Sequence, residues 1–582
     1  MAAPDREDRR LRSSTWFAGW GESAVEHRAS VRALGIELKP DDDRPVIGIA
    51  QSASDLNPCN ADLGSLAVAV KRGIWAAGGI PFEFPTISLG EDLMKPTAML
   101  YRNLMAMDVE ECLRSYPLDG VVLLANCDKT VPAQLMAAAS ADLPAIMLTG
   151  GQRRAGVFRG ARLGAGSDLW RYSEERRAGR MTDAEWAELE ACLGCSLGAC
   201  NTMGTASTMA LVAEALGMML PGVAALPTGD ARLVAAAETT GRRAVELVRE
   251  DLRPSAILSA EAIDNAIVTL AAIGGSTNAV IHLCAIAGRR GLRPPLDRFD
   301  ELGRPVPVIA DIRPSGAFLM DAFHEAGGLP TLHAEIRDLL RPEARTVTGR
   351  TLGEAIDAAA RTDGRVIRRR DDPLQATGAI AVLRGNLAPD GAILKLSAAS
   401  PSLYRHRGPA FIFETYEEML RLVDDPALPV TADSVLILRG VGPVGVPGMP
   451  EWGMIPLPSR LLAEGVTDMV RISDGRMSGT SYGTCILHVA PESAVGGPLA
   501  LVQQGDPIEL DVVARTLTLD VDQAELARRR AALAPAQTQH LRGWPRLYRE
   551  HVLQAPEGCD LDLLVPSGPA ALAFVEPTVG RS

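Results

Sequence analysis

Several features are scarce in this 582-residue sequence, and each scarcity excludes a class of protein. Cysteine occurs only nine times, an odd number that is too small for a disulfide scaffold, so a reducing compartment is expected. No apolar run reaches the length of about 18 residues that a membrane-spanning helix needs. The 59 basic residues are outnumbered by 72 acidic ones, and the net charge of −13 argues against general nucleic-acid binding. The eight histidines include no H-E-x-x-H pattern of a zinc hydrolase.

What remains is the composition of an ordinary soluble globular protein, with 47% hydrophobic and 23% charged residues. A chain of this length is too long for one hydrophobic core, so roughly two to four domains are expected. The charged N-terminal segment has no apolar signal core. The expected location is therefore the cytoplasm, with neither a membrane nor a nucleic acid as partner.

The order of predicted elements indicates an α/β fold followed by a β-rich region. Strands and helices alternate through residues 45–150, with a helix expected from about Pro96 to Ser115 and a buried strand in the apolar run at 120–124, which predicts a parallel sheet covered by helices. Residues 152–190 are polar and helical, and we expect them at the surface. After about residue 375 the pattern predicts a hairpin around Pro389-Asp390-Gly391 and further strands, as in a barrel or a sandwich. We therefore predict an arm at 1–44, an α/β domain at 45–375 and a β-barrel-like domain at 376–582.

Three cysteines, Cys59, Cys127 and Cys200, each lie in a loop that leads into a predicted helix. Helix N-termini carry partial positive charge, which lowers the pKa of a thiol and favours the metal-binding thiolate. Three thiolates around an iron–sulfur cluster leave one iron open as a Lewis acid. Two other interpretations stay open: the three are small buried residues, or Cys192 and Cys195 join Cys200 in a local zinc or ferredoxin-like set.

Oxygen ligands and hydroxyl groups form a second set of candidates. Glu91, Asp128 and Glu451 lie in loops, and together they could hold Mg²⁺, although each alone is typical of a solvated loop acid. Lys129, beside Asp128, is a salt-bridge partner or a chemically modified lysine. Ser478 follows a predicted strand in a segment rich in hydroxyls. It is a turn residue or a serine that loses its proton beside a metal.

Six short motifs occur in one order: NPCN at 57–60, NCDK at 126–129, GACNTM at 198–203, GGSTN at 274–278, PGMPE at 447–451 and DGRMSGT at 474–480. Together they resemble the motifs of the dihydroxy-acid and sugar-acid dehydratase family, and the likeness extends from about residue 30 to residue 580.

This resemblance implies a fold, cofactors and roles for the candidate residues. It implies an α/β N-terminal domain and a β-barrel-like C-terminal domain with the active site between them, in a homodimer or homotetramer. It implies Ser478 as the catalytic base, with Thr480 nearby. It also implies a [2Fe-2S] cluster held by Cys59, Cys127 and Cys200, and Mg²⁺ held by Glu91, Asp128, Glu451 and a carbamylated Lys129.

The segments 200–209 and 476–480 look more like the sugar-acid branch of that family, such as arabinonate, xylonate or galactonate dehydratases. The expected activity is a hydro-lyase that converts a small sugar acid (an aldonate) to a 2-keto-3-deoxy acid. One alternative is a dihydroxy-acid dehydratase of branched-chain amino-acid biosynthesis. Another is an electron-transfer iron–sulfur protein, which would need a fourth cysteine at its cluster. Cys192 and Cys195 lie outside the family pattern and are the cysteines that would compete for iron.

Overall fold

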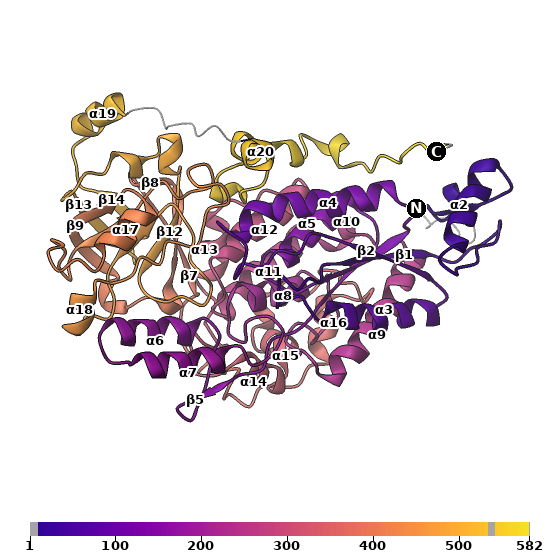
Figure 1. The fold of residues 1–582 in the computed structure, drawn as a ribbon, viewed down its shortest axis with the longest axis horizontal. Coiled ribbons are helices and arrows are strands. Elements are labelled where there is room, and N and C mark those ends of the chain that lie inside the picture. Colours follow the sequence, from indigo (N-terminus) through magenta and orange to yellow (C-terminus); the bar gives the residue numbers. More distant parts are fainter. Residues whose placement is uncertain (1–9, 534–541, 581–582) are drawn as a thin grey trace.

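The computed structural model describes residues 10–533 and 542–580. Residues 1–9 of the predicted arm lie outside the described residues. The same holds for residues 534–541 and 581–582 of the predicted C-terminal domain. Figure 1 shows a helix-covered sheet in indigo to magenta beside a barrel in orange. Within the described ranges, no helix combines the length and the apolar character needed to cross a membrane.

A four-stranded parallel sheet forms the centre of the N-terminal part. Its strands are β1 (Val46–Gln51), β2 (Ile80–Pro85), β3 (Gly120–Ala125) and β4 (Ala145–Thr149), in the order β2-β1-β3-β4. Every residue of β3 is buried, because an inner parallel strand is covered on both faces and needs apolar side chains on both. The predicted α/β class and its parallel sheet are confirmed.

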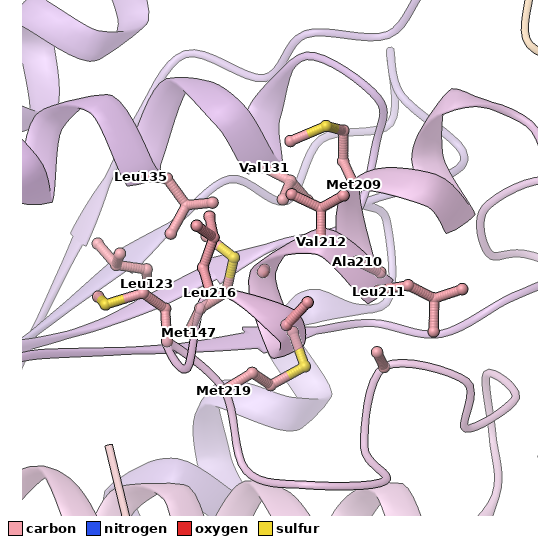
Figure 2. Packing of buried hydrophobic residues seen from close by; sticks show 14 of the residues in the cluster. Leu123, Val131, Leu135, Met147, Met209, Ala210, Leu211, Val212, Leu216 and Met219 are labelled. Carbon is pink, nitrogen blue, oxygen red and sulfur yellow. The ribbon is translucent and has the colours of Figure 1, made fainter. Parts of the chain in front are cut away.

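Helices enclose this sheet and extend the core away from it. Those near the sheet are α3 (Leu63–Ala76), α4 (Arg102–Ser115), α5 (Thr130–Ala141), α8 (Thr205–Ala215) and α9 (Ala231–Glu250). Every residue of α8 is buried. Figure 2 shows why: Met209 and Val212 of α8 pack among Leu123 of β3, Met147 of β4 and side chains of α5. This apolar packing fixes the loops at the ends of the strands.

The C-terminal part is a closed eight-stranded barrel with the strand order β10-β11-β12-β8-β7-β14-β13-β9. The barrel strands are β7 (Ile380–Gly385), β8 (Ala388–Lys395), β9 (Arg405–Phe413), β10 (Val435–Leu438), β11 (Arg471–Ser473), β12 (Cys485–Ala490), β13 (Pro507–Asp511) and β14 (Thr516–Leu519). The predicted β-barrel-like architecture is confirmed, and the sandwich alternative is wrong. The exact boundary at residue 375 stays a prediction.

Two local predictions are wrong. The turn of the first hairpin lies at residues 386–387, and Pro389-Asp390-Gly391 belong to β8, because Gly385 already pairs with Ala388. The helix expected from Pro96 begins only at Arg102, after a 3-10 turn at Ala98–Tyr101. In both cases the turn-forming residues of the sequence mark the neighbourhood of the turn and not its position.

The remaining helices flank these two parts, and a two-stranded ribbon, β5 (Val157–Phe158) with β6 (Ala161–Arg162), precedes α6. The helices are α1 (Ser14–Phe17), α2 (Glu22–Arg32), α6 (Ser167–Arg177), α7 (Asp183–Leu193), α10 (Pro254–Ile257), α11 (Ala260–Ala272), α12 (Asn278–Arg289), α13 (Asp297–Gly303), α14 (Met320–Glu325), α15 (Gly328–Glu335), α16 (Leu352–Asp357), α17 (Tyr416–Leu422), α18 (Ser459–Ala463), α19 (Gln523–Ala532) and α20 (Gly543–His551).

Candidate active site

A cavity of about 620 Å³ lies where loops of the sheet meet loops of the barrel. Loops that follow β1, β2 and β3 reach it, and the carboxyl ends of adjacent parallel strands are where α/β sheets bind ligands. Eight of the predicted site residues border the cavity: Cys59, Glu91, Cys127, Asp128, Cys200, Glu451, Ser478 and Thr480. Lys129 is the ninth, and it lies completely buried behind the carboxylates.

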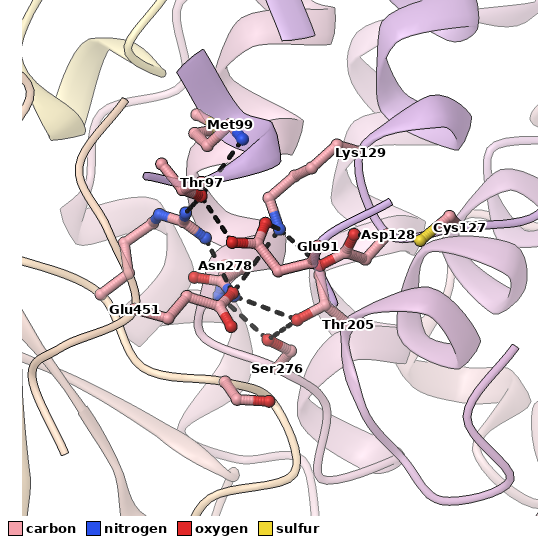
Figure 3. Close-up of polar contacts among 12 residues, drawn as sticks. Glu91, Thr97, Met99, Cys127, Asp128, Lys129, Thr205, Ser276, Asn278 and Glu451 are labelled. Atoms are coloured by element: carbon pink, nitrogen blue, oxygen red, sulfur yellow. Dashed lines mark hydrogen bonds and ion pairs between the residues drawn. The ribbon is translucent and has the colours of Figure 1, made fainter. Parts of the chain in front are cut away.

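Three carboxylates meet at one point on the wall of the cavity. Single oxygen atoms of Glu91, Asp128 and Glu451 all lie within 4.8 Å of one another. The Nζ atom of Lys129 lies 2.5 Å from Asp128, 3.4 Å from Glu91 and 3.5 Å from Glu451 (Figure 3). Burial disfavours the charged form of Lys129, but the three carboxylates outweigh it and hold its pKa above the ordinary value. The structure therefore brings the four predicted metal ligands together.

The donor set fits a hard divalent cation. Carboxylate oxygens are the ligands that Mg²⁺ prefers. The Oε2 atom of Glu91 is buried and accepts no hydrogen bond, although Lys129 Nζ lies 3.4 Å away, and burial raises the pKa of this carboxyl group. A cation would satisfy that oxygen and stabilise its charged form. A carbamate on Lys129 would add a further oxygen at the same point, because the amine already lies among the three acids.

Three further residues hold this carboxylate group, and the sequence reasoning gave none of them a role. The buried guanidinium of Arg476 lies 2.8 Å from Glu451 Oε1 and donates to Thr97 Oγ1 at 3.0 Å. Thr97 in turn donates to Glu91 Oε1 at 2.6 Å. Asn278 Nδ2 donates to Glu451 Oε1 at 2.6 Å. Arg476 and Asn278 lie inside two of the six motifs, and this position in the sequence indicates that they belong to the site. No feature of the sequence indicates a role for Thr97.

The three predicted cluster cysteines have free thiols and border the same cavity. A hydrogen bond from Cys127 lowers the pKa of Cys59, whereas that bond together with burial raises the pKa of Cys127. Burial raises the pKa of Cys200 to about 12, although the charge of Arg153 opposes the shift. The expectation that helix N-termini lower all three pKa values is therefore wrong for two thiols, because the hydrogen bond with Cys59 and burial raise the pKa of Cys127 and burial raises that of Cys200.

Soft sulfur donors still fit an iron–sulfur cluster, since metal binding displaces the thiol protons. Cys192 and Cys195 are not among the residues that border the cavity. Cys192 packs beside Leu189 in a small cluster, and the exposed Cys195 donates to the carbonyl oxygen of Arg154. In this arrangement neither competes with Cys59, Cys127 and Cys200.

Ser478 lies in the loop after β11, half-buried at the cavity. Its Oγ atom is 2.9 Å from Thr480 Oγ1, and Trp170 Nε1 donates to that same Thr480 oxygen at 3.1 Å. A Cβ atom on the intervening Gly479 would lie 2.6 Å from the backbone nitrogen of Thr205, so only glycine permits this close approach. The serine loop is thus held against the start of α8.

A half-enclosed cavity between two domains that combines carboxylates, thiols and a hydrogen-bonded serine defines the active site of an enzyme. The particular family follows from comparison with known proteins. The N-terminal family model of the dihydroxy-acid/6-phosphogluconate dehydratases matches residues 44–355, and the C-terminal model matches residues 365–559. The chain belongs to this dehydratase family and is a hydro-lyase.

Individual relatives match over almost their whole length. An L-arabinonate dehydratase of Rhizobium leguminosarum bv. trifolii is 50% identical, with 96% of each chain covered. A 6-deoxy-6-sulfo-D-gluconate dehydratase of Pseudomonas putida is 48% identical, over 97% of this chain and 98% of the relative. A dihydroxy-acid dehydratase of Halothermothrix orenii is 38% identical, over 93% of this chain and 98% of the relative.

Proposed function

We propose that the enzyme dehydrates a sugar acid of the aldonate type to a 2-keto-3-deoxy acid. One observation carries the proposal: Ser478, the carboxylate group and the three thiols border a single cavity. Its volume of about 620 Å³ accommodates a five- or six-carbon acid. Two of the relatives at about 50% identity are named for sugar acids, which supports this substrate class.

We further propose that Glu91, Asp128, Glu451 and a carbamylated Lys129 hold Mg²⁺, and that Cys59, Cys127 and Cys200 hold a [2Fe-2S] cluster. When bound, these groups would supply positive charge beside the substrate carboxylate and a Lewis acid for the departing hydroxyl. An NMR carbamate signal after incubation with ¹³C-labelled bicarbonate tests the modification, and the Lys129→Arg variant is expected to lack it.

Residues of the chain carry out the proton transfers of the reaction. Ser478, in its deprotonated form, takes the proton from C2, and its hydrogen bond with Thr480 orients the receiving oxygen. The hydroxyl on C3 leaves as the C2–C3 double bond forms, so a proton and a hydroxide are lost, which together make one water. The resulting enol takes a proton at C3 and loses the proton of its C2 hydroxyl, and so becomes the keto acid. Arg476 and Asn278 keep Glu451 in place throughout.

The test is a product assay on anaerobically purified protein with pentonates, hexonates and 2,3-dihydroxyisovalerate. Formation of 2-keto-3-deoxy acids is expected, and the Ser478→Ala variant is expected to lose about 10²–10⁴-fold in kcat. Turnover of dihydroxyisovalerate alone would refute the sugar-acid choice. Full activity of Ser478→Ala would remove the serine from the mechanism. The predicted homodimer or homotetramer is a separate proposal, for which light scattering gives the mass.

The dihydroxy-acid alternative is favoured by one observation, the apolar side chains on one wall of the cavity. Met419, Leu420 and Val423 line it from α17 and the residue that follows this helix. A branched alkyl tail would pack there. The part of the cavity lined by α6 is polar, however.

A further inference from the structure

Helix α6 forms the polar wall of the active-site cavity. Its residues Trp170, Ser173, Glu174 and Arg177 all line the cavity, because residues three, four and seven apart lie on one face of a helix. The prediction that residues 152–190 lie at the surface is therefore wrong for this face. In Figure 1, α6 lies below the barrel, and it contacts α18.

The first turn of α6 is fixed against the serine loop. Trp170 Nε1 donates to Thr480 Oγ1 at 3.1 Å. A Cβ atom on Gly166, the residue before the helix, would lie 2.3 Å from the same Thr480 oxygen, so glycine permits this contact. Asp168 accepts from Arg313 at 2.7 Å and so ties the helix to the α/β part. Through Thr480, Trp170 thus lies at about the position of Ser478 along the helix axis.

Polar groups continue along the cavity beyond that level. Tyr482 donates its hydroxyl to Glu174 Oε2 at 2.6 Å, which leaves Oε1 available to a ligand. The hydroxyl of Ser173 has no hydrogen-bond partner within the part of the chain that the structure describes. Arg177 is already bound to Asp424 at 2.6 Å and to the carbonyl oxygen of Leu457 at 2.7 Å.

The spacing matches the tail of a sugar acid. At about 1.5 Å of rise per residue, Glu174 lies roughly 6 Å beyond Trp170 along the helix. With C–C bonds of about 1.5 Å, C6 of an extended acid lies roughly 4 Å beyond C3. For a substrate that lies parallel to α6 with C2 and C3 at Ser478, the terminal hydroxyls of a six-carbon acid reach the level of Ser173 and Glu174, while an acid of four carbons ends before it.

We propose that α6 selects the substrate tail: Ser173 and Glu174 bind the terminal hydroxyls of a neutral five- or six-carbon aldonate. This inference rests on the proposed function of the cavity. The charges of this wall also oppose a terminal anion, because among the described residues beside α6 that line the cavity Glu174 and Asp424 outnumber the cation Arg177, which Asp424 already pairs. A sulfonated or phosphorylated tail is disfavoured.

The experiment compares Ser173→Ala and Glu174→Gln with the wild-type enzyme on a four-carbon acid, a hexonate and 6-deoxy-6-sulfogluconate. For the hexonate, KM is expected to rise about 10–100-fold in Glu174→Gln, as for a lost hydrogen bond to a charged group, with kcat nearly unchanged. The four-carbon acid is expected to be unaffected. Glu175→Gln is the matched control, because Glu175 is on the same helix but pairs with Arg180 at the surface.

Calorimetric binding of the hexonate to the same variants separates this inference from the proposed function. If no acid is turned over, the proposed function fails, while weaker binding by the variants still supports the tail contacts. Unchanged KM and unchanged binding in both variants would overturn the inference. Turnover of the sulfonated acid as efficient as that of the neutral hexonate would overturn it as well.

Discussion

Arg476 and Glu451 form a contact that joins the barrel loop after β11 to the carboxylate group: Nη1 of the arginine lies 2.8 Å from Oε1 of the glutamate, and the arginine side chain is fully buried. The same guanidinium donates to Thr97, which hydrogen-bonds Glu91. One buried cation therefore orients two carboxylates that come from different parts of the chain.

Replacing this arginine is expected to destabilise the protein severely. Arg476→Gln removes the nearer of the two cations beside the half-buried Glu451 and leaves only Lys129, at 3.5 Å, so the expected loss is about 3 kcal/mol of unfolding free energy, the low end for a broken buried ion pair. Equilibrium denaturation measures the loss. The control is Arg32→Gln, because Arg32 pairs with Glu37 at the surface, where the effect is expected to stay within about 0.5 kcal/mol. Equal losses in the two variants would contradict the role given to Arg476.

The hydroxyl of Thr480 is expected to set the pH dependence of the reaction. It lies between Trp170 and Ser478 in a chain of hydrogen bonds, and a donor to the charged form of a base stabilises that form. Thr480→Val removes this donor, so the rising limb of the pH–rate profile is expected to move to higher pH, with kcat lowered about tenfold. Thr480→Ser keeps the hydroxyl and is expected to restore the wild-type profile. An unshifted profile in Thr480→Val would exclude the hydrogen bond from catalysis.

The fold was predictable where the sequence pattern reflects burial along a whole element. The apolar run of β3 predicts a strand covered on both faces, and β3 is buried throughout. The positions of Cys59 and Asp128 at the ends of such strands predict that they meet. These are consequences of parallel-sheet geometry, which brings strand ends to one edge.

The parts that could not be predicted depend on loop geometry and on a cavity between domains. Thr97 acts on Glu91 only because a 3-10 turn delays the start of α4. The polar pattern of α6 is the same for a helix in water and for one that lines a polar cavity, so the pattern could not show that Glu174 meets Tyr482. A contact of this kind depends on how two distant segments pack.

Bound Mg²⁺ is expected to stabilise the folded protein. A ligand that binds only the folded state adds about 2.7 kcal/mol when its concentration is 100 times its Kd. The melting temperature of chelator-treated protein is therefore expected to rise with added Mg²⁺, and Asp128→Asn is expected to abolish the rise. Asp424→Asn is the control, because Asp424 borders the cavity outside the carboxylate group. A rise that Asp128→Asn leaves unchanged would place the cation elsewhere.

Lys395 at the end of β8 is expected to make stability depend on pH. Its side chain is fully buried with Nζ 3.4 Å from the carbonyl oxygen of Gly479, and burial lowers its pKa from 10.5 to about 7. Between these values the unfolded chain holds a proton that the folded protein lacks, so the free energy of unfolding increases as pH rises from about 7 towards 10. Below that window both states are protonated and the contribution no longer changes.

Relative to Lys395→Met, the wild-type protein is expected to gain on the order of 1 kcal/mol per pH unit, measured by equilibrium denaturation at several pH values. Lys39→Met is the control, since the side chain of Lys39 is exposed and its difference from wild type is expected to stay flat. A flat difference for Lys395→Met as well would mean that Lys395 keeps its proton when buried, in which case a cation lies against Gly479 in the loop that carries Ser478.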